Sequence, residues 1–187
     1  MFQVQLGLSK AINEVTLTGY TSVFGGDISV NPPPNQPPLR FRRSTGVPVV
    51  RSGDNPYGCL PYSAPHDDVA ILINRGECTF LEKLTLARAA GAAGVIIVSH
   101  EDFGVNPSAT EEELSAAGDL NNVAIVVLTN SDGKIVTDLM DSAEASSGQL
   151  MVALETRSPT PETGRRKVPD RILFLNGHPL LNTKLLI

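Results

Sequence analysis

The sequence lacks the short motifs that identify several enzyme classes. Its 187 residues contain no GxSxG nucleophile motif, no HExxH zinc motif and no phosphate-binding P-loop. No apolar run approaches the ~18 residues that a membrane-spanning helix requires. The formal net charge is −5 and the pI about 5.2, so no overall positive field favours nucleic acid or anionic lipid. We therefore expect no nucleic-acid partner and no membrane span in this chain.

Cysteine is scarce, with only Cys59 and Cys78. Two cysteines alone leave open whether they form a disulfide or stay as two free buried thiols. The residues that follow Met1 show neither a basic region nor a continuous apolar segment. This start is not typical of a signal peptide.

What the sequence does contain is one clear structural unit, from Val69 to Val98. It begins with the apolar run VAILI, which indicates a strand covered on both faces, and it ends with a second such run, VIIV. Thr79 stands three residues before Glu82, the spacing of a capping box, and predicts a helix that starts there. The unit is therefore a parallel strand–helix–strand crossover. One face of its helix is predicted to carry Phe80, Leu84, Ala87 and Gly91.

The rest of the chain offers weaker indications of structure. Buried strands are predicted at 123–128 and 150–154, and a half-buried strand at 15–24. Three further predictions concern a short acidic helix from Thr110, a helix capped by Asn130 or Ser131, and a hairpin turn at Asn176-Gly177. Composition indicates an exposed proline-rich loop at 31–38, an edge strand containing Arg40, Arg42 and Arg43, and a linker at 158–169.

The segment INRGECTFLEKLTLARAAGAAGVIIV closely resembles the core of the protease-associated (PA) domain. That family has an RGxCxF turn, then a helix with a lysine and an Ala-Gly-Ala end, and then a VIIV strand. The residues that match this pattern are Arg75, Gly76, Cys78, Phe80, Lys83, Ala90, Gly91 and Ala92. The resemblance extends over about Gly53–Thr156. It departs from the family at Asn121–Ala124, where PA domains carry a proline before the next strand.

The resemblance implies an α/β (α+β) fold, namely a β-rich open sheet or barrel with a parallel strand–helix–strand core and flanking helices. We expect the chain to divide into N-terminal strands with the proline-rich loop packed on the core (1–52), the PA core (53–157), a linker (158–170) and a C-terminal strand or hairpin (171–187). A Cys59–Cys78 disulfide is also implied, and with it an oxidising compartment. Because no signal peptide is visible, we expect a fragment of a longer secretory-pathway protein that resides in the endoplasmic reticulum lumen.

PA domains have no activity of their own and occur inside larger proteins. The loops of this chain, HEDFGVNPSA among them, look most like the C-terminal PA region of fungal ER degradation-enhancing α-mannosidase-like proteins of glycoside hydrolase family 47. The implied function is a non-catalytic interaction or substrate-recognition module of such a mannosidase in glycoprotein quality control and ER-associated degradation. The alternative hosts are a secreted or vacuolar protease or aminopeptidase, a sorting receptor, and a membrane RING ubiquitin ligase.

The resemblance also implies partners and cofactors. The partner would be a glycoprotein client or another protein, such as an oxidoreductase of the protein disulfide isomerase class. No cofactor is expected for this chain itself, whereas the mannosidase domain of the host would be expected to use calcium.

The loop at 99–108 is the predicted working surface. It follows the carboxyl end of a buried strand, where ligands gather in open α/β sheets, and it is longer and more polar than a simple connection requires. An aromatic side chain beside hydrogen-bonding groups suits contacts with a protein or a sugar. An ordinary solvent-exposed loop is the alternative. The candidate residues are His100, Glu101, Asp102, Phe103 and Asn106.

A small self-contained enzyme is the competing functional class. It would use His66, His100 or His178 with nearby acids, but none of these histidines lies in a motif that supplies a paired ligand or base. The run His66-Asp67-Asp68 would need further ligands to hold a metal ion. Glycosidic cleavage needs two carboxylates held on opposite sides of the sugar, and the sequence shows no such arrangement of acidic residues. We therefore predict no catalytic, cofactor-binding or metal residues.

Overall fold

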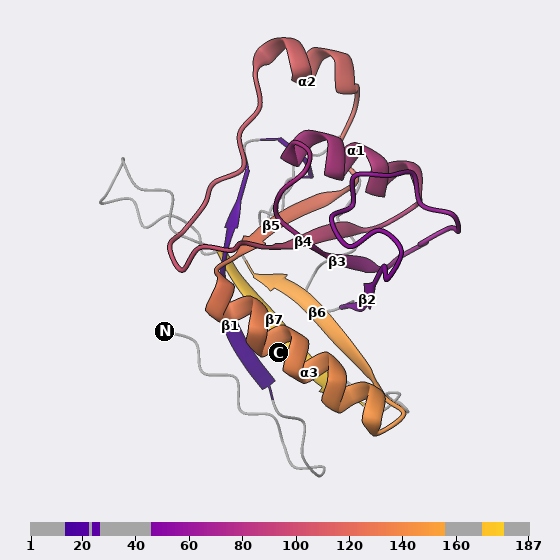
Figure 1. Cartoon of the computed structure of the whole chain (residues 1–187), viewed down its shortest axis with the longest axis vertical. Helices are drawn as coiled ribbons and strands as arrows, with labels where there is room; N and C mark the ends of the chain where they lie inside the picture. The colour runs from indigo at the N-terminus through magenta and orange to yellow at the C-terminus, as the bar shows by residue number, and fades with distance from the viewer. Residues whose placement is uncertain (1–13, 23, 27–45, 156–169, 178–187) are drawn as a thin grey trace.

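A computed structural model describes residues 14–22, 24–26, 46–155 and 170–177 of the chain. This part contains seven strands and three helices (Figure 1). In chain order the elements are β1 (Glu14–Thr21), β2 (Val47–Arg51), β3 (Ala70–Asn74), α1 (Phe80–Ala89), β4 (Gly94–Val98), α2 (Glu111–Ala117), β5 (Ala124–Leu128), α3 (Asn130–Ala145), β6 (Gln149–Glu155) and β7 (Asp170–Gly177).

The strands form a closed barrel in the order β1-β5-β4-β3-β2-β6-β7. Strands β2, β3, β4 and β5 run parallel to one another, and β3, β4 and β5 are paired along their full five-residue length. The other contacts are antiparallel, with β7 between β6 and β1. The α/β fold class and its parallel strand–helix–strand core are thus confirmed. Strands β1 and β7, from the two ends of the described chain, are part of the same barrel.

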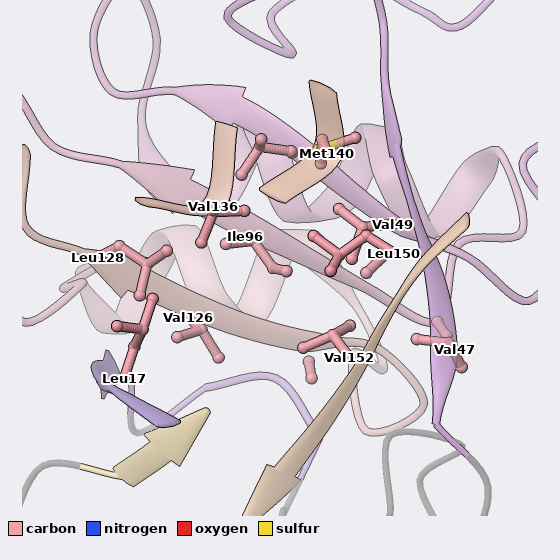
Figure 2. Packing of buried hydrophobic residues seen from close by; sticks show 14 of the residues in the cluster. Leu17, Val47, Val49, Ile96, Val126, Leu128, Val136, Met140, Leu150 and Val152 are labelled. Atoms are coloured by element: carbon pink, nitrogen blue, oxygen red, sulfur yellow. The ribbon is translucent and has the colours of Figure 1, made fainter. Parts of the chain in front are cut away.

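The three central strands are buried on both faces, as their continuous apolar sequences predict. Alternate residues of β4 show the arrangement: Val95 and Ile97 pack in one cluster with α1, whereas Ile96 packs in a second cluster with α3. The second cluster lies inside the barrel, where Figure 2 shows Val136 and Met140 of α3 close to the apolar side chains of the strands. Helix α2 contributes only partly buried side chains to the first cluster and extends away from the barrel in Figure 1.

Helix α1 begins as predicted, but its buried face differs from the prediction. The Thr79 hydroxyl accepts a hydrogen bond from the Glu82 amide (3.1 Å), and the Glu82 carboxylate accepts one from the Thr79 amide (2.8 Å). Gly91 is not on the helical face. The helix ends at Ala89, and Gly91 follows it in a left-handed conformation (φ 85°). The buried residues of the helix are Leu81, Lys83, Leu84 and Ala87.

Helix α3 starts one residue earlier than predicted. Its N-cap is Thr129, whose hydroxyl accepts a hydrogen bond from the Asp132 amide (3.2 Å), so the expectation of Asn130 or Ser131 was wrong. Gly133, in the first turns of this helix, permits a very close approach to β4. A Cβ atom placed there would lie 2.2 Å from Val98 Cγ1. The short helix after Thr110 is confirmed as α2, with its own capping box.

The predicted hairpin turn at Asn176-Gly177 is wrong, because both residues belong to β7. They are paired with Leu150 and Gln149 of β6. The loop at 31–38, the strand containing Arg40–Arg43, the linker at 158–169 and His178 lie outside the described residues.

Candidate functional site

The carboxyl ends of the parallel strands form one edge of the barrel, and backbone hydrogen bonds join the segments that leave it. The Arg75 amide, just after β3, donates to the Val98 carbonyl of β4 (2.8 Å), and the Ser99 amide, just after β4, donates to the Leu128 carbonyl of β5 (2.9 Å). The Arg75 guanidinium also approaches the Ser99 hydroxyl, with a distance of 3.4 Å between Nη1 and Oγ. The loop at 99–108 therefore leaves the sheet next to an arginine.

The start of this loop is fixed to the N-terminus of α3. The Asp102 carboxylate accepts hydrogen bonds from the Ser131 amide (2.8 Å) and the Ser131 hydroxyl (2.6 Å). These bonds hold the pKa of Asp102 below its ordinary value. The Glu101 carbonyl accepts from the Asn130 amide (2.8 Å). The first amides of α3 are thus used by the loop itself, so this helix end is not a free anion site.

The loop is also packed against β1 immediately after its exposed aromatic residue. A Cβ atom placed at Gly104 would lie 2.2 Å from two atoms of the Tyr20 ring, so the loop backbone lies directly on that ring. Phe103, between the Asp102 anchor and this contact, is 63% exposed. The loop therefore holds an apolar ring in solvent on a backbone that is tied down on both sides.

The five predicted residues of this loop have different surroundings. His100 and Glu101 lie side by side, with 3.3 Å between Nε2 and Oε1, and His100 is exposed. Asp102 is engaged in capping α3, whereas Phe103 and Asn106 are exposed. The sequence did not reveal that Ser131 and Tyr20 hold the loop. Aspartate is a residue type that often caps helices, but its position in the sequence does not indicate a helix that begins 28 residues later. The parallel order of β4 and β5 brings Asp102 and the start of α3 together.

The Cys59–Cys78 disulfide is present, as the resemblance implies, with Cα atoms 5.8 Å apart. It joins the segment before β3 to the turn before α1. Beside it lies Lys83 of α1, which is fully buried. Its ammonium donates hydrogen bonds to the carbonyls of Gly76 (2.8 Å) and Tyr57, and it lies 3.3 Å from Cys59 Sγ. Burial lowers the pKa of Lys83, while the charges of Glu77 and Glu82 oppose that shift.

The two described histidines belong to the segments before and after β4. The His66 amide donates to the Ala90 carbonyl, before β4 begins, whereas His100 follows the end of β4. The two therefore lie at opposite ends of that strand. Among the described residues no three His, Cys, Asp or Glu side chains are grouped so that they could hold a metal ion. No helix within the same ranges is long and apolar enough to cross a membrane.

Comparison with known proteins identifies the central part of the chain. The model of the PA domain family matches residues 45–136. Signal peptide peptidase-like 3 of Oryza sativa subsp. japonica is 30% identical over 145 residues, which are 76% of this chain and 25% of that protein. RING finger protein 148 of Bos taurus is 37% identical over 101 residues, which are 51% of this chain and 29% of that protein. The chain thus spans between a quarter and three tenths of the length of these relatives.

Among solved structures, BSAP, a zinc aminopeptidase from Bacillus subtilis, matches 80% of this chain and 37% of its own. Its identity is 15% and the TM-score 0.41, a likeness that carries no argument about function.

Proposed function

Because residues 45–136 form a PA domain, we propose that this chain is a non-catalytic recognition module of a larger protein, and that the 99–108 loop is its working surface. The observation that carries the proposal is Phe103, an aromatic ring 63% exposed on an anchored loop. A loop whose backbone is held in place before binding loses little conformational entropy on contact, which favours recognition. Earlier in the same loop, His100 and Glu101 supply polar groups.

The proposed partner is a protein surface or the glycoprotein client of the host. An oxidoreductase of the protein disulfide isomerase class is one such partner that the family resemblance suggests. The disulfide supports residence in an oxidising compartment of the secretory pathway. Within that pathway we propose the endoplasmic reticulum lumen.

For the larger protein that contains this chain we propose only a class. The names of the two relatives, a signal peptide peptidase-like protein and a RING finger protein, favour the peptidase and RING hosts over the others. The mannosidase host of family 47, with its calcium, stays a prediction.

None of these hosts would give this chain itself a catalytic step. Pure protein incubated with a high-mannose N-glycan should therefore release no hexose, and measurable, divalent-dependent trimming would contradict the non-catalytic proposal.

A binding experiment with Glu101→Ala/Phe103→Ala tests the loop. The immobilised protein is presented with purified oxidoreductase of the protein disulfide isomerase class, and separately with a denatured high-mannose glycoprotein and its deglycosylated form. The double variant should bind the recognised probe at least tenfold more weakly. Its stability should change by about 0.5 kcal/mol or less, because Asp102 and the backbone contacts that anchor the loop are untouched.

The matched control is Ile135→Ala/Asp138→Ala, which removes one exposed apolar and one exposed acidic side chain from α3. The control should bind like the parent. If the loop variant binds every probe as strongly as the parent does, the loop is only a connection between β4 and α2.

A further inference from the structure

The two sulfurs of the Cys59–Cys78 disulfide have different surroundings. Lys83 Nζ lies 3.3 Å from Cys59 Sγ. The Tyr57 and Gly76 carbonyl oxygens lie 3.5 and 3.6 Å from the same sulfur. Within the described residues, Cys78 Sγ has no comparable polar contact. Both cysteine residues are partly exposed.

The charge on Lys83 favours negative charge on Cys59 over negative charge on Cys78. When a thiolate opens a disulfide, one sulfur leaves as a thiolate, and it leaves faster when that thiolate is more stable. A nearby ammonium group is one of the surroundings that stabilise a thiolate. The partial negative charges of the two carbonyls act in the opposite sense, but both carbonyls are already hydrogen-bonded to the same ammonium. The full positive charge at 3.3 Å is therefore the larger effect.

We propose that this disulfide is a thiol-exchange site of fixed polarity, in which Cys78 receives the incoming thiol and Cys59 is the leaving group. A glutathione thiolate attacks Cys78 Sγ. The bond between Cys78 and Cys59 breaks, a mixed disulfide forms on Cys78, and the electron pair remains on Cys59 as a thiolate beside Lys83. In the reverse step the Cys59 thiolate attacks Cys78 Sγ and expels glutathione as its thiolate. No oxidant or further reductant is consumed.

Lys83 also keeps the opened site in place. Its two carbonyl partners, Tyr57 and Gly76, belong to the two segments that the disulfide joins. Breaking the sulfur–sulfur bond therefore leaves these segments held by hydrogen bonds to one buried ammonium. Cys59 stays next to Cys78, and the mixed disulfide can be resolved without refolding.

The direct test maps the mixed disulfide on the native, full chain. The protein is incubated with reduced and oxidised glutathione, quenched with acid at early times, alkylated and analysed by peptide mass spectrometry. Glutathione should be found on Cys78 in about tenfold excess over Cys59, because the sulfur with the more stable thiolate leaves faster. Equal labelling of both cysteines would overturn the proposal. So would opening that occurs no faster than global unfolding.

Two variants separate the charge of Lys83 from its packing. Lys83→Met keeps most of the side-chain volume. It should abolish the preference for Cys78 and slow the opening of the disulfide about tenfold. The control Lys134→Met, which replaces an exposed lysine of α3, should change neither the preference nor the rate.

A third variant tests the thiol of Cys59 directly. In Cys78→Ser, the remaining Cys59 thiol should react with iodoacetamide about tenfold faster at pH 7 than the same thiol in the unfolded chain. An unchanged preference in folded Lys83→Met, or a Cys59 thiol that reacts as in the unfolded chain, would contradict the proposal. The wild-type mapping remains decisive if Lys83→Met does not fold.

Discussion

Gly133→Ala should destabilise the protein although it replaces a helical glycine by the best helix former. The new methyl group would lie 2.2 Å from Val98 Cγ1, 2.9 Å from Cγ2 and 3.0 Å from Cβ. A rotation of the valine side chain cannot relieve all three contacts, because Cβ is attached directly to the β4 backbone. Helix α3 must therefore move away from β4.

Two opposing effects set the size of the change. Overpacking a core position costs about 1–3 kcal/mol, and the β-branched neighbour places this site in the upper half of that range. Alanine regains about 1 kcal/mol through its helix propensity. The net loss should be about 1–2 kcal/mol, which lowers the melting temperature of a chain of this size by about 3–6 °C.

Urea unfolding of a double-mutant cycle checks this reasoning. In a Val98→Ala background both Cγ atoms are gone, so Gly133→Ala should cost much less, with a coupling energy of about 1 kcal/mol or more. Gly53→Ala is the control, because nothing lies within 4 Å of a Cβ atom placed there, and it should change stability by at most about 0.5 kcal/mol. If Gly133→Ala costs the same in both backgrounds, or stabilises the parent, the close approach of α3 to β4 is not what requires glycine.

Three further predictions concern the disulfide and the caps. Replacing both Cys59 and Cys78 by alanine should lower the free energy of unfolding by about 3 kcal/mol, since the bond closes a loop of 19 residues, and a loss below about 1 kcal/mol in chemical unfolding would be inconsistent with this. Asp102→Asn should reduce stability at neutral pH. Because the folded-state pKa of Asp102 is lowered, its contribution is present above about pH 4 and is lost as the pH falls through the folded value, so parent and variant should converge at acid pH, and a constant difference would contradict the cap. Thr79→Ala should cost about 0.5–2 kcal/mol by removing the N-cap of α1, whereas Thr85→Ser, elsewhere on the same helix, should cost less; equal losses in thermal unfolding would contradict the capping role.

Local patterns were enough to predict much of the barrel. The apolar runs gave β3, β4 and β5, and the spacing of Thr79 and Glu82 gave the start of α1. These features depend on neighbours in sequence, so the sequence alone contains them. The N-cap of α3 was missed by one residue because Thr129, Asn130 and Ser131 are all good capping residues, and their order alone does not decide among them.

Features that depend on contacts between distant segments could not be predicted in this way. Lysine is almost never fully buried, so nothing in the helix pattern indicated that Lys83 would be. It is buried because Tyr57 and Gly76, in two other segments, present carbonyls to it. The candidate loop was located correctly as the segment after β4, but its anchoring by Asp102 and Ser131 depends on strand order.

Closure of the barrel by β1 and β7 affects how the protein is made. The two strands pair over Glu14–Gly19 and Asp170–Leu175, although they lie about 150 residues apart in sequence. A ribosome adding 5–20 residues per second needs about 8–30 s to synthesise the stretch between them. The contacts within the β3–α1–β4 unit are local and can form during that time, whereas most of β1 waits for β7. The emerging chain therefore exposes unpaired strand edges to its neighbours and to chaperones until β7 is complete.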